Sequence, residues 1–447
     1  MREQWRSKLG FIWSAVGSAV GLGSIWRFPY VVGENGGATF IFLYLICLVI
    51  IGIPVLISEL TIGRKTQLSP KGAFQELGKW GPIGKGMVFT GFLVSTFYGV
   101  ISGWTFGYLF QALKGGLTSL SSGSEASQLF ADLTASPIWA VGYLALFMLV
   151  GGYVLYAGVQ KGIEKGNKIM VPLLVVVLIL LAIKGLTLPG GTKGIAFLFK
   201  PDWSMVSGAA ILMALGQAFF SLSLGQGTMV TYGSYLSQKE NLTETCFPIS
   251  FFGVIISLLA GVAIFTIVFA VGVSPSSGES LMFQTLPLIF SQMKGGYFLC
   301  LLFFVLLFLA AMTSQISALE PAISYLIDEK KWKRKKAVIF VVVASFLVGV
   351  PSALSFGVLK DVNIFDQTIF SAVLNLCINI LIPLGGLAAV LLVGWRWGIK
   401  KALHHMETGS HGLFKRFPFL RGYFRIGIKY VAPVIILIIM LDALGLF

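Results

Sequence analysis

The feature that most constrains this chain is a series of apolar runs long enough to cross a lipid bilayer. The run FIFLYLICLVIIGIPVLISEL, residues 40–60, holds a single charged residue, and about 18 consecutive apolar residues already indicate a membrane-spanning helix. The whole chain is 56% hydrophobic and 11% charged, against about 25% charged in a soluble domain. Because the strands of a membrane barrel alternate apolar and polar residues, we predict an all-α integral membrane protein.

The apolar runs predict eleven transmembrane helices within one domain that covers residues 1–447. The longest stretches between them are two outer loops, at about 114–136 and 187–206, and one inner loop at 395–426. The predicted spans are 10–36, 38–63, 86–113, 137–157, 167–186, 207–236, 246–273, 293–326, 337–356, 364–393 and 427–446.

The basic residues predict how the chain is oriented in the cell membrane. With the N-terminus inside, all but seven of the 33 Lys and Arg residues fall in the N-terminal segment or in inner loops. Lys and Arg accumulate on the cytoplasmic side of membrane proteins, so we predict a cytoplasmic N-terminus and an extracellular C-terminus. The net charge of +15 then reflects topology and contact with lipid headgroups, and nucleic acid is not an expected partner.

Two predicted spans carry glycines that disfavour a continuous helix. The first contains AVGLGSIWRFPY and the sixth contains LSLGQGTMVTYGSY, which place Gly21, Gly23, Gly225 and Gly227 within the membrane. Each glycine disfavours a helix by about 1 kcal/mol relative to alanine. Glycine-interrupted spans five helices apart indicate an inverted-repeat transporter, here with halves 10–186 and 207–393 and an added helix at 427–446. The alternative is close helix packing, since Gly17-x-x-x-Gly21 is also a small-xxx-small motif.

Broken helices give this chain a chemistry that regular helices lack. Irregular backbone is tolerated in a membrane only where it is buried in protein or lines a wet cavity. There, freed carbonyl groups coordinate cations, and N–H groups at the start of a half-helix bind anions. Two facing breaks therefore suit a zwitterionic amino acid together with sodium.

The segments RFPYVVGENGG (27–37) and QAFFSLSLGQG (217–227) resemble the neurotransmitter:sodium symporter family, and the resemblance extends from about residue 5 to residue 433. It implies the fold of the bacterial leucine transporter, a 5+5 inverted repeat with broken helices 1 and 6. It also implies sodium-coupled transport of an amino acid or amine.

The resemblance implies two sodium sites, of which one departs from the family pattern. In the first site, Ser24 and Gly253 stand where the family usually has amide or acid side chains, while Ala19 and Ser221 still offer oxygens; coupling to one sodium ion is therefore a hypothesis. The second site is an uncharged oxygen cage, which suits a monovalent cation because divalent ions favour carboxylates. The alternative for its two hydroxyls is bonding back to their own helix. The matching residues of the second site are Gly17, Val20, Ala310, Thr313 and Ser314.

The resemblance also implies how a substrate is held. Its carboxylate would bind near Leu22, Gly23 and the Tyr98 hydroxyl, and its amine would meet carbonyls including that of Ala19. Gly21 stands where transporters of biogenic amines have an acid, so the implied substrate is an amino acid with its own carboxylate. The other implied binding residues are Val94, Phe220, Ser221, Ser223, Gln226, Ser314 and Ala318.

Chloride is a further implied ligand. Its matching residues are Tyr44, Gln217, Ser221 and Ser257, and no acidic residue occupies these positions. The alternative is that the four side chains make ordinary hydrogen bonds between helices.

The gates that the resemblance implies are pairs of opposite charges. Arg27 and Asp366 would close the outer side, the alternative being that Arg27 extends outward to water. Arg2 and Asp328, with Trp5 packed below them, would close the inner side. The resemblance also implies two structural roles. Glu59 is the acid that would support the broken sixth helix, and Gly162 and Pro172, ten residues apart, are the pair that would let the fifth helix unwind.

We therefore predict a sodium-coupled symporter that imports a neutral amino acid by alternating access, with chloride as a candidate co-ion. The alternatives are an amino-acid-binding membrane receptor and an ion-conducting permease without coupled transport. An enzyme is not expected, because His404, His405 and His411 share one inner loop and no nucleophile or metal set accompanies them within the membrane.

Overall fold

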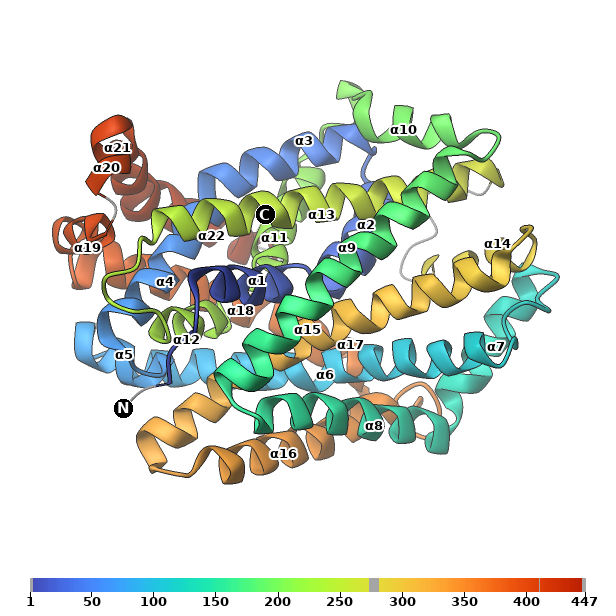
Figure 1. Cartoon of the computed structure of the whole chain (residues 1–447), viewed down its shortest axis with the longest axis horizontal. Coiled ribbons are helices and arrows are strands. Elements are labelled where there is room, and N and C mark those ends of the chain that lie inside the picture. Colours follow the sequence, from blue (N-terminus) through green and yellow to red (C-terminus); the bar gives the residue numbers. More distant parts are fainter. Residues whose placement is uncertain (1–2, 273–280, 410, 444–447) are drawn as a thin grey trace.

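The computed structural model describes residues 3–272, 281–409 and 411–443 of the chain. Long helices lie along the long axis of the molecule, and shorter helices gather at its two ends (Figure 1). The left end of that view holds α5 (Pro70–Gly78), α19 (Ile399–Glu407), α20 (His411–Arg416) and α21 (Phe419–Ile426), and the right side holds α7 (Gly123–Ala135), α10 (Gly191–Phe199) and α14 (Thr285–Ser291).

Nine helices in the described residues are long and apolar enough to cross a membrane. Five of these spans are single α-helices: α6 (Gly81–Leu113), α8 (Pro137–Tyr156), α13 (Thr243–Ala270), α15 (Gly296–Lys330) and α16 (Arg334–Leu354). In a sixth, the π-helical turn η3 (Val159–Glu164) continues directly into α9 (Lys165–Leu186). In the other three spans, α-helices and π-helical turns follow one another without a gap. One consists of α3 (Ala38–Cys47), η2 (Leu48–Gly52) and α4 (Ile53–Thr66), and another consists of α17 (Ile369–Asn375), η6 (Leu376–Leu381), α18 (Ile382–Leu391) and η7 (Leu392–Arg396). The last consists of α21, η8 (Gly427–Val431) and α22 (Ala432–Ala443).

The two remaining predicted spans are the ones that carry the glycines, and both are interrupted. In the first, α1 (Lys8–Ala19) is separated by three residues from η1 (Gly23–Arg27) and α2 (Phe28–Glu34), and the two parts are bent by 50°. In the sixth, α11 (Gly208–Ser221) and α12 (Thr228–Ser234) are joined by an irregular segment. The prediction that these helices are broken is confirmed.

The break in the sixth span requires glycine for two physical reasons. Gly225 and Gly227 have φ values of +77° and +78°, a region that favours glycine because it has no Cβ atom. A Cβ on Gly225 would also lie 1.9 Å from the Ile382 carbonyl oxygen in α18. The broken segment therefore packs directly against the backbone of another span.

Four predicted spans begin five or more residues from the observed start. The third begins at Gly81 instead of 86, and the eleventh begins at Phe419 instead of 427. The fifth span begins at Val159 instead of 167, because the polar sequence VQKGIE adds a π-helical turn that packs beside the N-terminal segment. The tenth begins at Ile369 instead of 364, because β1 (Asn363–Ile364) and β2 (Gln367–Thr368) pair as an antiparallel hairpin. The loop predicted at 114–136 contains α7, and the inner loop predicted at 395–426 contains α19 to α21.

Candidate substrate and ion site

The breaks of the first and sixth spans meet at one cavity of about 30 Å³, room for little more than a water molecule. Nine of the eleven residues predicted to bind the substrate line it, and the other two, Leu22 and Ser221, do not. The cavity is narrow because Ser314 and Tyr98 close over Gly21, where an added Cβ would lie 1.9 Å from Ser314 Oγ. The lining residues are Ser18, Ala19, Gly21, Gly23, Val94, Tyr98, Phe220, Ser223, Leu224, Gln226, Ser314, Ala318 and Ile382.

Tyr98 joins α6 to the break in the first span. Its hydroxyl oxygen accepts a hydrogen bond of 2.9 Å from the Leu22 backbone N–H. This is one of the two N–H groups that were predicted to hold a substrate carboxylate. The geometry thus brings a backbone donor and a phenol hydroxyl to the same point beside the cavity.

Ser18, which was not predicted as a site residue, connects three spans. Its carbonyl oxygen accepts hydrogen bonds from Ser223 Oγ at 2.8 Å and from Ser314 Oγ at 3.1 Å. Its own hydroxyl donates to Ser317 Oγ at 2.8 Å. A small polar residue three positions before the glycine break was the available signal.

The residues of the second predicted sodium site lie where α1 packs against α15. Thr313 Oγ1 donates to the Ala310 carbonyl oxygen at 3.0 Å, and Ser314 donates to α1, so both hydroxyl oxygens keep lone pairs for a cation. The described residues contain no cluster of three or more His, Cys, Asp or Glu that could hold a metal ion. These neutral oxygens fit a monovalent hard cation better than a divalent one.

The residues of the first predicted sodium site satisfy one another. Ser24 Oγ donates to the Ala19 carbonyl oxygen at 3.0 Å, so one predicted ligand bonds to another. Gly253 has no side chain, and nothing lies within 4 Å of the position of an added Cβ. The departure seen in the sequence therefore leaves Ser24 and Ser221 as the residues of this predicted site that have side-chain oxygens.

The four residues predicted to hold chloride do not form one hydrogen-bonded group. Tyr44 Oη and Ser221 Oγ lie 3.1 Å apart. Gln217 instead accepts from Arg27 and donates to the Gly23 carbonyl oxygen at 3.0 Å. Ser257 Oγ bonds back to the Gly253 carbonyl oxygen of its own helix at 2.9 Å.

The predicted outer pair of Arg27 and Asp366 is not formed in this structure. Arg27 is 7% exposed, its Nη1 donates to Gln217 Oε1 at 2.5 Å, and its guanidinium carbon lies 5.6 Å from the Phe220 ring centre. Asp366 is exposed in the turn between β1 and β2, with a φ of +59°. The hairpin that replaces the first turn of the tenth span keeps the carboxylate in solvent.

The predicted inner gate is partly described, because Arg2 lies outside the described residues. Trp5 Nε1 donates to the Tyr232 carbonyl oxygen of α12 at 3.0 Å. Asp328 Oδ2 accepts from the Ser69 N–H at 2.6 Å. A pair that was not predicted lies beside them, in which partly buried Arg334 donates to both carboxylate oxygens of buried Glu320 at 2.8 and 2.9 Å.

Glu59 lies where the resemblance placed it. Its Oε1 accepts a hydrogen bond of 2.7 Å from the Gly225 N–H, within the break of the sixth span. Both residues are buried, so this contact supplies an acceptor to a backbone group that water does not reach.

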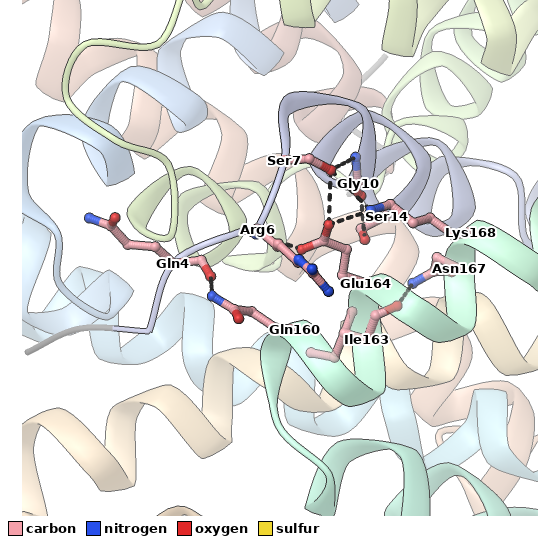
Figure 2. Close-up of polar contacts among 10 residues, drawn as sticks. All are labelled: Gln4, Arg6, Ser7, Gly10, Ser14, Gln160, Ile163, Glu164, Asn167 and Lys168. Carbon is pink, nitrogen blue, oxygen red and sulfur yellow. Dashed lines mark hydrogen bonds and ion pairs between the residues drawn. The ribbon is translucent and has the colours of Figure 1, made fainter.

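The start of the fifth span carries a polar cluster that sequence analysis missed (Figure 2). Buried Glu164 accepts hydrogen bonds from the Arg6 N–H at 2.7 Å and from Ser7 Oγ at 3.0 Å, and it pairs with Lys168 Nζ at 2.7 Å.

The Gly–Pro pair predicted for the fifth span lies beside this cluster. Gly162 lies in the π-helical turn, where a Cβ would be 1.9 Å from the Val154 carbonyl oxygen. Pro172 lies within α9, which is a continuous helix here.

Comparison with known proteins agrees with this architecture. Residues 2–127 and 135–446 match the Sodium:neurotransmitter symporter family. The chain belongs to this family. As a member, it is a sodium-dependent transporter that crosses the membrane several times.

Individual relatives of this transporter match it over almost their whole length. An uncharacterized sodium-dependent transporter of Bacillus subtilis, YhdH, is 36% identical over 99% of this chain and 98% of the relative. An uncharacterized sodium-dependent transporter of Haemophilus influenzae is 35% identical over 99% of this chain and 98% of its own. The crystal structure of MhsT in complex with L-phenylalanine superposes with a TM-score of 0.90 at 42% identity, over 99% of this chain and 100% of that one.

Proposed function

We propose that this symporter imports a neutral amino acid together with sodium. The observation that carries the proposal is the cavity at which the two helix breaks meet. The Leu22 N–H and the Tyr98 hydroxyl lie beside it, and its described lining includes backbone and hydroxyl oxygens but no charged side chain. A substrate that brings both of its own charges suits such a lining, because an unpaired buried charge is costly.

The solved relative supports the substrate class. MhsT was crystallised with L-phenylalanine, and this chain shares its fold at 42% identity. The cavity here combines apolar Val94 and Ala318 with polar Gln226. We propose a neutral side chain for the substrate on this basis.

We propose that sodium is coordinated by oxygens of Gly17, Val20, Ala310, Thr313 and Ser314. Chloride, the candidate co-ion, would bind beside the Tyr44–Ser221 contact. Alternating access would then open the two ends of the molecule in turn. The basic end would lie in the cytoplasm, and the two five-helix halves would move relative to each other.

The outer gate would change its hydrogen-bond partner during this cycle. When the outer side closes, Arg27 would leave Gln217 and pair with Asp366. The hydrogen bond from Arg27 to Gln217 gives that exchange a defined starting state.

Uptake of labelled amino acids into proteoliposomes, one at a time, tests the proposal. An inward sodium gradient should drive accumulation, and potassium should not; gluconate in place of chloride tests the co-ion. Binding of an amino acid without accumulation would favour a receptor, and sodium current without any amino-acid flux would favour a permease. Either result, with folded protein, would overturn the symport proposal.

A pair of tyrosine variants tests the site itself. Tyr98→Phe removes the hydroxyl beside Leu22 and should raise the half-saturating amino-acid concentration about tenfold, the effect of losing one hydrogen bond to a charged group. Tyr108→Phe is the matched control, since Tyr108 is also buried in α6 and its hydroxyl has no partner among the described residues. Equal effects of the two variants would contradict the assigned role of Tyr98.

A further inference from the structure

One buried polar oxygen of the fifth span lacks a hydrogen-bond donor. Asn167 is fully buried in the first turn of α9, and its Nδ2 donates to the Ile163 carbonyl oxygen at 2.9 Å. Its Oδ1 has no partner among the described residues. A buried acceptor without a donor destabilises a fold. This oxygen is therefore a candidate ligand for a cation in some state of the transport cycle.

The unpaired oxygen faces the first span at Gly17. A Cβ on Gly17 would lie 2.5 Å from Asn167 Oδ1 and 3.0 Å from Val171 Cγ2. Gly17 is one of the two residues of the first span whose carbonyl oxygens we propose as sodium ligands. Asn167 therefore places a neutral oxygen on the Cβ side of a residue whose carbonyl oxygen we propose as a sodium ligand.

Further oxygens continue from this point toward the N-terminal end of α1. Ser14 Oγ donates to the Gly10 carbonyl oxygen at 2.8 Å, and Glu164 Oε1 fills the space where a Gly10 Cβ would lie. Figure 2 shows Asn167 one turn along α9 from Glu164, with Ser14 and Gly10 on the facing helix. Polar groups thus run along the α1–α9 contact from Gly17 toward the N-terminal segment.

We propose that Asn167 Oδ1 is a transient ligand for the sodium ion when it leaves the Gly17 carbonyl oxygen toward the N-terminal end of α1. This inference rests on the proposed sodium coupling. A site along a conduction route must bind an ion well enough for entry and weakly enough for departure. A neutral amide oxygen meets both conditions, and pairing with Lys168 limits how strongly Glu164 would retain the same ion.

Two transport modes separate this role from simple packing. Net uptake into sodium-free liposomes requires each ion to leave on the inner side. Exchange of labelled for unlabelled amino acid, with saturating sodium on both sides, does not require net release of the ion. A ligand on the release route affects the first mode, whereas a packing defect affects both.

The test uses the full-length protein in proteoliposomes with Asn167→Leu and Asn167→Asp. Asn167→Leu should slow net uptake about tenfold, equivalent to about 1.4 kcal/mol of barrier, and leave exchange unchanged. Asn167→Asp should lower the half-saturating sodium concentration, because a carboxylate binds a hard cation more strongly than an amide does. Exchange activity also reports that each variant is folded.

Gln315→Leu is the matched control. Gln315 is likewise a fully buried amide whose Nε2 donates to a backbone carbonyl, that of Ser95 at 3.0 Å, and whose Oε1 has no partner among the described residues. It lies on α15 and contacts α6 and α8 instead of α1. If Gln315→Leu gives the same separation of net uptake from exchange, or if Asn167→Leu slows both modes equally, the inference is wrong. Absence of sodium-dependent uptake in the unmodified protein would instead overturn the proposed function and, with it, this inference.

Discussion

The Glu59 carboxylate of α4 and the Gly225 N–H of the broken sixth span are joined by a hydrogen bond of 2.7 Å. Gly225 also packs closely on α18, since an added Cβ would lie 1.9 Å from the Ile382 carbonyl oxygen. One residue in the irregular segment is therefore fixed by two other spans. A break in a membrane helix is stable only when neighbouring groups satisfy its backbone in this way.

Replacing Glu59 tests this support. Glu59→Leu leaves the Gly225 N–H buried without an acceptor, at a cost of about 1–3 kcal/mol, and should weaken amino-acid binding about tenfold or more. Glu59→Gln keeps an acceptor and should change binding much less. Equilibrium binding of labelled amino acid to purified protein measures both. A Gln variant as weak as the Leu variant would show that the charge, and not the hydrogen bond, is what the site needs.

Gly21 should be intolerant of any side chain. A Cβ there would lie 1.9 Å from Ser314 Oγ and 2.6 Å from Tyr98 Oη, and overpacking of this kind costs about 1–3 kcal/mol. Gly21→Ala should therefore reduce sodium-dependent uptake about tenfold or more. Gly216→Ala in α11 is the control, because nothing lies within 4 Å of its Cβ position. Comparable losses in both variants would mean that alanine acts through the helix and not through the cavity.

Glu164 should hold the N-terminal segment against the fifth span. Glu164→Leu removes the acceptor of Arg6, Ser7 and Lys168. Hydrogen–deuterium exchange of the amides in residues 4–10 should become about tenfold faster or more, since the loss of a buried charged acceptor costs upward of about 1.4 kcal/mol of local stability.

Glu244→Gln provides the comparison on the same segment. Glu244 pairs with Lys8, but both side chains are substantially exposed, and exposed ion pairs contribute little. Exchange in residues 4–10 should stay near that of the unmodified protein. If the two variants exchange alike, burial of the Glu164 carboxylate is not what anchors the segment.

His405 should make stability depend on pH. Burial, together with the nearby charges of Arg64, Lys65 and His404, lowers the pKa of His405 to about 3. Its Nε2 accepts from Arg64 Nε at 3.3 Å, which requires the neutral ring. The unfolded chain takes up a proton near pH 6.5 while the folded protein does not, so stability should fall as the pH drops from about 6.5 toward about 3.

Thermal unfolding between pH 7 and pH 4 checks this dependence. His405→Gln should flatten the decline of the melting temperature below about pH 6.5. His404→Gln, which changes the exposed neighbour in α19, should leave most of the decline in place. An unchanged slope in His405→Gln would assign the dependence to other groups.

Some parts of this protein follow from local sequence. The apolar runs predicted the transmembrane helices because a segment in lipid must satisfy its own backbone, and the glycine pairs predicted both breaks. Hydropathy failed at the start of the fifth span, where the polar residues of VQKGIE are helical because the N-terminal segment packs on them. It also failed at 364–368, where a hairpin replaces the expected turn of helix.

Apolar length, backbone freedom and motifs were enough to predict the class of fold, the position of the breaks and most of the residues that line the cavity, although Ser18, Leu224 and Ile382 were not predicted. Which polar groups pair with one another was established by the packing of the helices. Arg27 bonds to Gln217 instead of Asp366, and Glu164 holds residues 6 and 7. Asn167 turns an unpaired oxygen toward Gly17. Such pairings depend on how helices distant in the chain are placed against one another, and a side chain's identity does not specify its partner.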